Sequence, residues 1–308
     1  SFNKRVQNEK FAVCNFFIRR IFRIAPMYYL GIIYYIIQNG TGWNYWLGDA
    51  THISWSNILS NFLFLHGFNP YWINSVVPGG WSIAVEMLFY LFLPFIFQRI
   101  RNSNDALVFF IVSLIGRCAL HLFFEANPLI SDIRLWNEYL FFYFPNQLPV
   151  FALGVLMYFY IIDSEKNIKI VWSGKILLIL GCMMLIQLTA GIKALFLSEH
   201  ILFGLAFLIL GIALSKYKPV VLVNSVINYI GKVSFSMYLV HFAVLYWLKY
   251  LGLVNYVQNV ELNFVIRFFT VVLVTIVCSS FTYKLIEVPF QKIGKKLIIK
   301  MESKYEIR

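Results

Sequence analysis

A glutamate lies inside an apolar stretch of this chain, where a charged side chain is costly. Glu86 follows Trp81-Ser82 and precedes a run of leucine and phenylalanine. A carboxylate near the middle of a membrane helix costs roughly 2.5 to 3.5 kcal/mol on insertion scales, so such residues usually serve a function. Ser82, Glu86 and Tyr90 are spaced i, i+4 and i+8, which places them on one stripe of a helix. We expect this stripe to face protein or water, where Glu86 either supports acid–base chemistry or pairs with an arginine of another helix.

Three arginines lie at the beginning of the first apolar run, at Arg19, Arg20 and Arg23. On a helix they occupy about 100° of arc, so their guanidinium groups can converge on one anion. The planar fork of arginine suits phosphate, which a coenzyme A or nucleotide donor would supply. The alternative is a cluster that orients the chain in the membrane and contacts anionic lipid, and charge alone favours this alternative.

Two further groups of residues place histidine in apolar segments. Tyr238 and His241 are spaced i, i+3, and Arg117 and His121 are spaced i, i+4. A histidine in a membrane helix can relay protons or bind a substrate hydroxyl, but more often it makes a hydrogen bond between helices. Because an unpaired cation is costly in a membrane, we expect Arg117 to face the same interior as Glu86.

Membrane helices must position these residues. Hydrophobic residues make up 60% of the 308 residues and charged residues only 13%, a composition that excludes a soluble domain of this length. We therefore predict an all-α, polytopic membrane bundle with about eight transmembrane helices, each long enough to cross the hydrocarbon layer. The predicted spans lie near residues 22–38, 83–98, 106–124, 141–162, 171–190, 200–215, 230–251 and 263–285.

The distribution of charge predicts the orientation of these spans. A net charge of +12 could indicate a nucleic-acid partner, but lysine and arginine cluster in alternate connections, which is the positive-inside pattern of membrane proteins. We therefore expect a lipid bilayer as partner, no nucleic acid, and a plasma (inner) membrane with both ends of this chain on the cytoplasmic side. The connections near 39–80, 125–139, 191–199 and 252–262 are expected to face outward. The four cysteines are scattered singly, so we expect neither a metal site nor a disulfide.

The longest connection, residues 39–80, is rich in tryptophan, asparagine and glycine. A connection of this length is more often functional than incidental. Its apolar stretch at 58–65 is too short to span, so we expect it to lie at the membrane interface or to re-enter. The Pro-Gly-Gly sequence at 78–80 is expected to form the turn that begins the helix carrying the glutamate. His52 and His66 are interpreted as unremarkable surface histidines.

Five short motifs follow one another across residues 16–290. They are Arg19-Arg20-x-x-Arg23-Ile24-x-Pro26-x-Tyr28; Trp81-Ser82-x-x-x-Glu86 with Phe89-Tyr90 and Pro94; Gln147-Leu148-Pro149-Val150-Phe151-Ala152-Leu153-Gly154; Gly231-Lys232-x-Ser234-x-Ser236-x-Tyr238-Leu239-x-His241; and Tyr283-Lys284-Leu285-Ile286-Glu287-Val288-Pro289-Phe290. Each motif alone is weak, but the five in this order are specific. Together they resemble the membrane acyltransferase-3 family, the integral membrane O-acyltransferases of surface polysaccharides.

The resemblance implies an enzyme that moves an acyl group, most simply acetyl, from cytoplasmic acyl-coenzyme A to a sugar hydroxyl. The acceptor would be a cell-envelope polysaccharide or a lipid-linked glycan. No bound cofactor is implied, because acetyl-coenzyme A or another acyl-coenzyme A is the donor substrate. Arg20 and Arg23 would bind the donor, and Ser82 and Glu86 would support catalysis. The residues that would line the acceptor cavity are Trp81, Tyr90, Arg117, His121, Tyr238 and His241.

The family form has about ten spans, against about eight in this chain, and its catalytic histidine is expected on the first of them. We therefore expect residues 1–308 to form a single acyltransferase-like domain that lacks its N-terminal helices and this histidine. Two other readings stay open. In a transporter or flippase, Glu86, Arg117 and His121 would line a transport path, although the inverted repeat typical of such proteins is not evident. In a non-catalytic membrane partner, the same residues would be structural.

Overall fold

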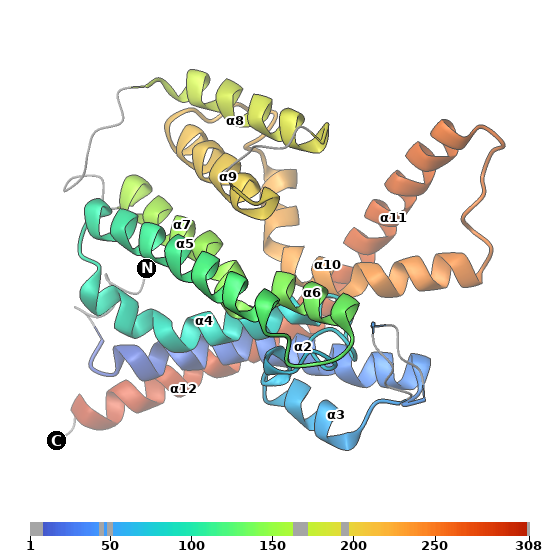
Figure 1. Cartoon of the computed structure of the whole chain (residues 1–308), viewed down its shortest axis with the longest axis horizontal. Coiled ribbons are helices and arrows are strands. Elements are labelled where there is room, and N and C mark those ends of the chain that lie inside the picture. Colours follow the sequence, from blue (N-terminus) through green and yellow to red (C-terminus); the bar gives the residue numbers. More distant parts are fainter. Residues whose placement is uncertain (1–8, 43–45, 48–51, 163–171, 192–196, 307–308) are drawn as a thin grey trace. The chain divides into compact units, whose positions relative to one another are not determined.

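The computed structural model describes residues 9–42, 46–47, 52–162, 172–191 and 197–306 (Figure 1). All regular secondary structure in these residues is helical, as predicted. The chain divides into two compact units. Residues 1–66, 74–80 and 225–308 form what we call the terminal unit, and residues 67–73 and 81–224 form the central unit. The basic residues expected to be cytoplasmic at 1–8 and 163–171 lie outside the described residues.

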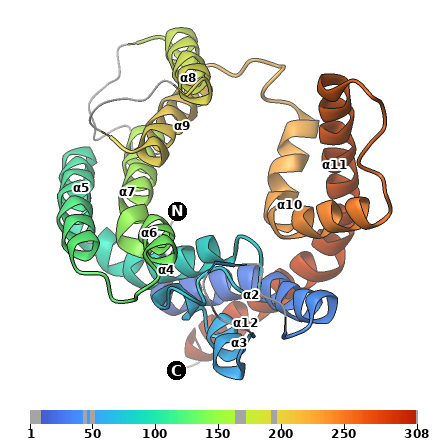
Figure 2. The same ribbon diagram turned by 45° about the vertical axis from the view of Figure 1, so that its right-hand side comes forward.

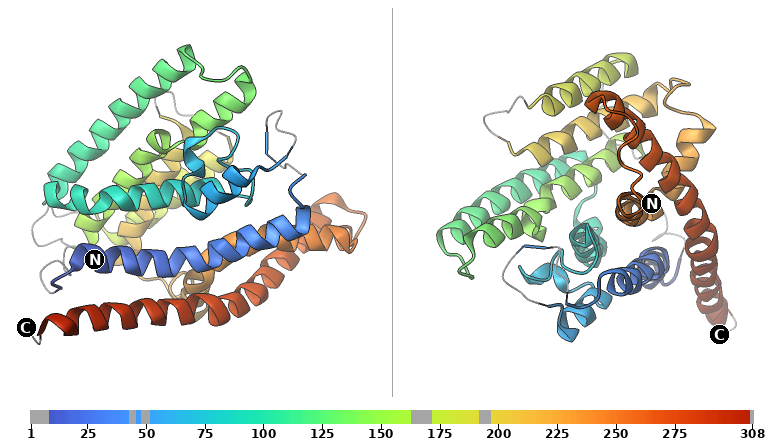
Figure 3. Two further views of the ribbon diagram at one scale, coloured as in Figure 1. Left: turned by 90° about the horizontal axis from the view of Figure 1, so that it is seen from below. Right: turned by 90° about the vertical axis from the view of Figure 1, so that its right-hand side faces the viewer.

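The terminal unit is built around α2 (Ala12–Asn39). This helix packs against α3 (Trp55–Phe62), α10 (Ser225–Tyr250) and α12 (Val288–Glu306). Figure 2 shows α10 beside α11 (Val260–Thr282), and Figure 3 shows α12 running alongside α2. A single π-helical turn, η3 (Tyr283–Glu287), joins α11 to α12.

Within the described residues, the central unit holds six helices that are neighbours in sequence. They are α4 (Gly80–Arg99, whose first residue belongs to the terminal unit), α5 (Ser103–Ala126), α6 (Ile133–Phe142), α7 (Phe144–Ile161), α8 (Gly174–Thr189) and α9 (Glu199–Lys216). α7 packs against both α5 and α9, and α8 packs against α9 (Figure 2). α4 contacts α7 through stacked aromatic rings, with the centroids of Phe89 and Phe151 4.4 Å apart. Apolar, aromatic faces thus hold this unit together.

The helices confirm a polytopic membrane protein. Six helical segments in the described part of the chain are long and apolar enough to cross a membrane. They are Ala12–Asn39, Gly80–Arg99, Ser103–Ala126, Ile133–Ile161, Glu199–Lys216 and Val260–Ser303. The other two predicted spans are also helices: α8 is apolar but has 16 residues, and α10 has 26 residues. α10 is less apolar because it carries Lys232, His241 and several serines. Each of the eight predicted spans therefore corresponds to a helix.

Local sequence explains where several helices begin. Asn102 accepts a hydrogen bond from the backbone amide of Asp105 at the start of α5, and Asp132 does the same for Leu135 at the start of α6. Such side-chain caps satisfy amides that have no partner within the helix. The predicted turn before α4 is confirmed, since Gly79 has a φ of 74° and α4 begins at Gly80. A positive φ of this size favours glycine.

The apolar stretch predicted at 58–65 forms most of α3, a helix of eight residues. Asn57, Ile58 and Asn61 are buried on one side of α3, whereas Trp55 and Leu59 are exposed on the other. α3 packs against α2. The prediction that this stretch is too short to span is therefore confirmed, and its asparagines face the protein.

Candidate functional site

A buried polar cluster forms around Tyr28 of α2. The Tyr28 hydroxyl donates to Asn61 Oδ1 at 2.8 Å and lies 3.1 Å from His66 Nε2. His66 Nε2 also lies 3.1 Å from the carbonyl oxygen of Gly80. Because a carbonyl only accepts, Nε2 carries the proton and donates to Gly80, while the Tyr28 oxygen accepts from the same group. We call Tyr28, Asn61, His66 and Gly80 the Tyr28 cluster.

The position of His66 corrects the interpretation from sequence, which treated it as an unremarkable surface histidine. Its side chain is 0% exposed, and its ring stacks on that of Tyr28 with centroids 5.8 Å apart. Burial lowers the pKa of His66 to about 4, although the backbone carbonyls of Gly80 and Ser60 oppose this shift. His66 is therefore uncharged at neutral pH. The available sequence signal was the pair Asn57 and Asn61, whose i, i+4 spacing marks a polar face on α3.

A second tyrosine holds the neighbouring glycine. The Tyr238 hydroxyl donates to the carbonyl oxygen of Gly79 at 2.8 Å, and a Cβ at Gly79 would lie only 2.6 Å from that hydroxyl. A Cβ at Gly80 would lie 3.0 Å from the Tyr28 hydroxyl. Tyr28 and Tyr238 thus contact the two glycines from which α4 starts, and these glycines leave space for the hydroxyl groups.

Tyr238 and His241 lie on the same helix, α10, at the i, i+3 spacing seen in the sequence. Their ring centroids lie 6.0 Å apart on α10. The Nδ1 of His241 lies 3.2 Å from the carbonyl oxygen of Met237 in the same helix, and its ring packs on Phe242. Nδ1 therefore donates within its own helix.

Three of the sequence motifs meet at Glu287. The carboxylate of Glu287 is 1% exposed and accepts a close hydrogen bond from the hydroxyl of Ser236, which is also buried. Arg23 of α2 acts on this carboxylate electrostatically. Glu287 is the last residue of the π-helical turn η3, and such turns are frequent at functional sites. The sequence placed Glu287 within a motif, but not among the site residues.

The three arginines of the first motif have different surroundings. Arg19 forms an ion pair with Glu9, with Nη2 and Oε2 2.8 Å apart. The Arg20 guanidinium lies over the Phe16 ring, 5.4 Å from its centroid. Arg23 is exposed. Glu9 therefore neutralises Arg19. Arg20 and Arg23 are the two arginines predicted to bind the donor.

The predicted stripe on α4 is partly linked by hydrogen bonding. The Tyr90 hydroxyl donates a close hydrogen bond to the Glu86 carboxylate one turn earlier. Ser82, Glu86 and Tyr90 are half-buried rather than sealed in the core. Trp81, at the start of the same helix, contacts the ring of Phe142 in α6, with centroids 4.5 Å apart. Glu86 is thus half-buried and, among the described residues, is bonded to a phenol, not to a cation. This arrangement favours a carboxylate that contacts a ligand or water over one that serves in a structural ion pair.

The sequence predicted that Arg117 faces the same interior as Glu86 but did not predict its partner, which the structure shows to be other residues. Its Nε donates to Asn146 Oδ1 at 2.7 Å, and its Nη2 donates to the hydroxyl of Ser198. No carboxylate of the described residues forms an ion pair with it. The reason is that α5, which carries Arg117, packs against α7, which carries Asn146. Sequence spacing does not reveal which helix faces which.

Two histidines lie on helices near Arg117. His121 is on α5, which also carries Arg117, and His200 is on α9, whose N-cap residue is Ser198. The Nδ1 of His121 is buried and has no hydrogen-bond partner among the described residues. The Nε2 of His200 lies 3.1 Å from the backbone oxygen of Asn146 and donates to it. His121 was predicted as a cavity residue. The sequence reasoning missed His200, Asn146 and Ser198, and their only signal was the position of Asn146 directly before Gln147.

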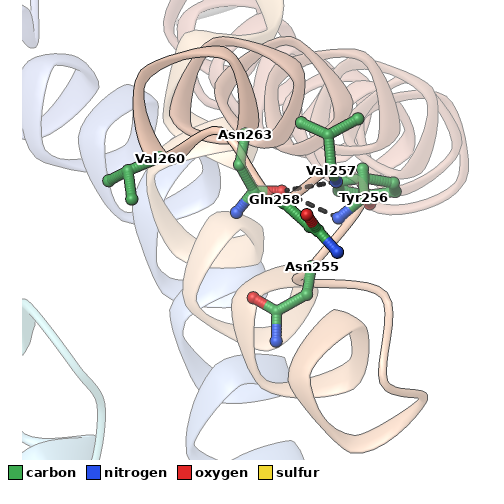
Figure 4. A pocket seen from close by; sticks show the side chains of 6 residues that line it. All are labelled: Asn255, Tyr256, Val257, Gln258, Val260 and Asn263. Atoms are coloured by element: carbon green, nitrogen blue, oxygen red, sulfur yellow. Dashed lines mark hydrogen bonds between the residues drawn. The ribbon is translucent and has the colours of Figure 1, made fainter.

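A shallow pocket lies in the connection between α10 and α11 (Figure 4). Asn263 Oδ1 accepts from the backbone amide of Tyr256 at 2.7 Å and from that of Val257, as the dashed lines in Figure 4 show. These bonds fold the connection onto the start of α11. None of the predicted site residues lines this pocket. Its lining residues are Asn255, Tyr256, Val257, Gln258, Val260 and Asn263.

Comparison with known proteins identifies the family. The chain is 25% identical over 244 residues to a protein of Staphylococcus aureus strain COL whose name provisionally assigns it O-acetyltransferase activity; the match covers 71% of this chain and 37% of that protein. It is 27% identical over 231 residues to the O-acetyltransferase OatA of S. aureus strain NCTC 8325, covering 70% of this chain and 36% of OatA. The chain thus matches little more than a third of the length of these curated relatives. No solved structure matches it. A family model described as an acyltransferase domain matches residues 7–284, and the chain therefore belongs to the acyltransferase-3 family.

Proposed function

We propose that the full-length protein is a membrane O-acetyltransferase that moves an acetyl or similar acyl group from acyl-coenzyme A to a sugar hydroxyl. The acceptor would be a cell-envelope polysaccharide or a lipid-linked glycan. The observation that carries the proposal is the meeting of Arg23, Ser236 and Glu287, which come from three separate family motifs. The O-acetyltransferase names of the relatives support the same reaction class.

Arg20 and Arg23 are proposed to hold the phosphates of the donor. Arg19 is paired with Glu9, so its charge is already balanced. The Arg20 guanidinium lies over the Phe16 ring and Arg23 is exposed. A guanidinium binds phosphate through parallel N–H groups. Glu287 then acts as the residue that orients Arg23, through charge attraction from a carboxylate that Ser236 holds in place.

Glu86 is proposed to orient the reacting hydroxyl, with Ser82 beside it on the same stripe. In the reaction the sugar oxygen attacks the thioester carbonyl, a C–O bond forms, the C–S bond breaks, and the hydroxyl proton ends on the released coenzyme A thiol. A carboxylate within hydrogen-bond reach of the hydroxyl raises its nucleophilicity. The Tyr90 hydroxyl fixes the Glu86 carboxylate, and rigid placement of this kind is what positioning catalysis needs.

The charge pattern supports a plasma-membrane location with both ends of this chain on the cytoplasmic side. In this orientation the arginines near the beginning of α2 lie on the cytoplasmic side, where acyl-coenzyme A is made. The connection before α4 faces outward, towards the envelope glycan. Trp81, Tyr238 and His241 are proposed to line the path of the acceptor.

The proposed function is tested with the full-length protein, acetyl-coenzyme A and mass spectrometry of surface glycans from cells with and without the gene. Loss of the gene should remove acetyl groups from one glycan. Glu86→Gln should lower kcat/KM about a hundredfold or more without lowering membrane abundance, because it removes a charged group that acts on the reacting hydroxyl.

The matched control is Glu138→Gln, which removes an exposed carboxylate from α6. It should leave the rate unchanged. Unchanged glycan acetylation in cells without the gene would contradict the proposed function. Wild-type rates in the Glu86→Gln enzyme would contradict only the role given to Glu86.

A further inference from the structure

The central unit contains a cation without a balancing charge. Arg117 lies in α5, within a segment apolar enough to cross a membrane. Its oxygen partners, Asn146 Oδ1 and the Ser198 hydroxyl, are both neutral, and no carboxylate of the described residues pairs with it. A cation in a membrane segment is costly unless an opposite charge or water compensates it. The surroundings of Arg117 therefore leave a place for an anion.

The guanidinium of Arg117 is held rigidly but is not saturated. A guanidinium has five N–H donors, of which Nε and one on Nη2 reach oxygen atoms. Nη1 faces the sulfur of Cys118 at 3.9 Å, and a thiol is a weak acceptor. Asn146 is itself fixed by two hydrogen bonds. Its Nδ2 donates to the backbone oxygen of Phe141 at 2.7 Å, and its backbone oxygen accepts from His200 Nε2. The frame thus orients donors that have no oxygen partner.

Tyr143 supplies a second observation that points to a ligand. Its side chain is 4% exposed, and its hydroxyl has no hydrogen-bond partner among the described residues. The ring belongs to an aromatic cluster with Trp136 and Leu140, while the hydroxyl interacts electrostatically with Arg117. A buried hydroxyl without a partner is rare and usually marks a missing group.

From these contacts we propose that Arg117 and Tyr143 form a binding site for a singly charged oxyanion, a carboxylate or a phosphodiester, on the acyl acceptor. The guanidinium offers only donors and the Tyr143 hydroxyl can also donate, so one negatively charged acceptor of hydrogen bonds would satisfy both groups. Assigning the oxyanion to the acceptor rests on the proposed acyltransferase function. The site itself does not. The acceptor class is then an acidic sugar or a phosphodiester-linked glycan rather than a neutral one.

The site is tested by binding, without acyl donor. The protein is placed in micelles of dodecyl maltoside, which contain no phosphate or carboxylate. Affinity is measured by the rise in thermal unfolding midpoint with added glucuronate, dimethyl phosphate or glucose at equal ionic strength. Glucuronate or dimethyl phosphate should raise the midpoint, whereas glucose should not. A response to neither anion, or an equal response to glucose, overturns the proposal.

Two variants connect the response to the site. Arg117→Gln should raise the Kd of the responding anion on the order of tenfold or more, because it removes a charge-assisted hydrogen bond. Tyr143→Phe should raise the Kd roughly fivefold without lowering the stability of the ligand-free protein, since the lost hydroxyl has no protein partner. The control Arg134→Gln changes an exposed arginine of α6 and should bind as wild type does. Wild-type affinity in Tyr143→Phe, a variant that should fold normally, overturns the site.

The source of the oxyanion is tested by changing lipid and acceptor. If nanodiscs of phosphatidylglycerol abolish the response to added anion, a lipid headgroup occupies the site and the assignment to the acceptor is overturned. If the response persists, the full-length enzyme should acetylate acidic glycans at least tenfold faster than neutral ones, and Arg117→Gln should remove this preference. Binding with no acetyl transfer to any glycan would contradict the proposed function but not the oxyanion site.

Discussion

At the scale of single residues, an uncharged histidine in the Tyr28 cluster contacts the first residue of the helix that carries Glu86. His66 donates to the Gly80 carbonyl, and Tyr28 accepts from His66 while donating to Asn61. A second proton would have to bind the buried Nδ1 of His66, which has no hydrogen-bond partner among the described residues, and would add a buried charge there with no carboxylate to balance it. The cluster is therefore sensitive to acid.

The protein should lose stability in mild acid through His66. Its folded pKa of about 4 lies below the ordinary value of 6.5. The unfolded chain therefore binds the proton more readily than the folded protein does. The contribution of neutral His66 to the free energy of unfolding is fully present above about pH 6.5 and is lost as the pH falls towards 4. The contribution is about 3 kcal/mol. The measurement is the free energy of unfolding in detergent micelles between about pH 7 and about pH 4.5.

The controls for this prediction are His66→Gln and His52→Gln. His66→Gln should be less stable at neutral pH but should lack most of the acid slope. His52 is exposed, so His52→Gln should keep the wild-type slope. An unchanged slope in His66→Gln would show that another group is responsible.

Arg20 and Arg23 give a second prediction at this scale. In the full-length enzyme, Arg20→Ala with Arg23→Ala should raise the KM for acetyl-coenzyme A roughly tenfold or more, because two charge-assisted contacts to phosphate are lost. Arg101→Ala, which removes an exposed arginine, should leave this KM unchanged. An unchanged dependence on donor concentration in the double variant would return the pair to the lipid-contact interpretation.

At the scale of elements, α12 completes the start of α2. The N-cap residue of α2, Phe11, has no side chain that caps the helix. Glu302 takes this role from α12, because its carboxylate accepts from the backbone amides of Lys10 and Phe11 at 3.3 and 3.2 Å and from Asn15 Nδ2 at 2.6 Å. Further along the pair, Gly294 packs against Phe22. The two helices therefore run antiparallel, with the last described turns of α12 beside the first turn of α2 (Figure 3).

Removing this cap should loosen the beginning of α2. Glu302→Ala should increase hydrogen exchange at the amides of Lys10 and Phe11, directly before α2, roughly fivefold, because these two amides lose their acceptor. Exchange in the middle of α2 should not change. The control Ser303→Ala removes a hydroxyl that bonds only within α12. Equal exchange in Glu302→Ala and wild type would show that other contacts hold this end.

At the scale of the whole molecule, the family motifs are divided between two units. The terminal unit gathers the arginine motif, the Ser236 motif and the Glu287 motif, while the central unit holds the Glu86 stripe and the segment that begins at Gln147. Each unit also has its own polar cluster, a buried one around Tyr28 and a partly buried one around Arg117. Hydrophobic faces form both units, but polar residues from distant segments define their sites.

The proposed orientation predicts a labelling pattern on the two sides of α5. After the four cysteines are replaced by alanine, Ser131→Cys should react with an impermeant maleimide in intact cells, because it follows α5 on the outer side. Arg101→Cys, which precedes α5, should react only after the membrane is opened. The opposite pattern would reverse the orientation. Labelling of both sites in intact cells would contradict the assignment of α5 as a span.

Composition and apolar run length predicted the helices well, because the hydrocarbon layer imposes a length and an apolar surface on each span. Motif order predicted the family. The helical turn also predicted which residues close in sequence share a face, and the structure then shows contacts within two of these pairs, Glu86 with Tyr90 and Tyr238 with His241. These relations depend only on local geometry and on the membrane as solvent.

Contacts between helices were decided by tertiary structure. Three findings depend on which helix faces meet. They are the burial of His66, the hydrogen bond between Ser236 and Glu287, and the hydrogen bond between Arg117 and Asn146. The spacing of residues within one helix does not predict these contacts. It shows which residues share a face of that helix, but not which other helix packs against the face. The sequence by itself determined a helical membrane acyltransferase-family protein with a costly glutamate. Only packing decided which polar groups balance one another and which, like Arg117 and Tyr143, are left for a ligand.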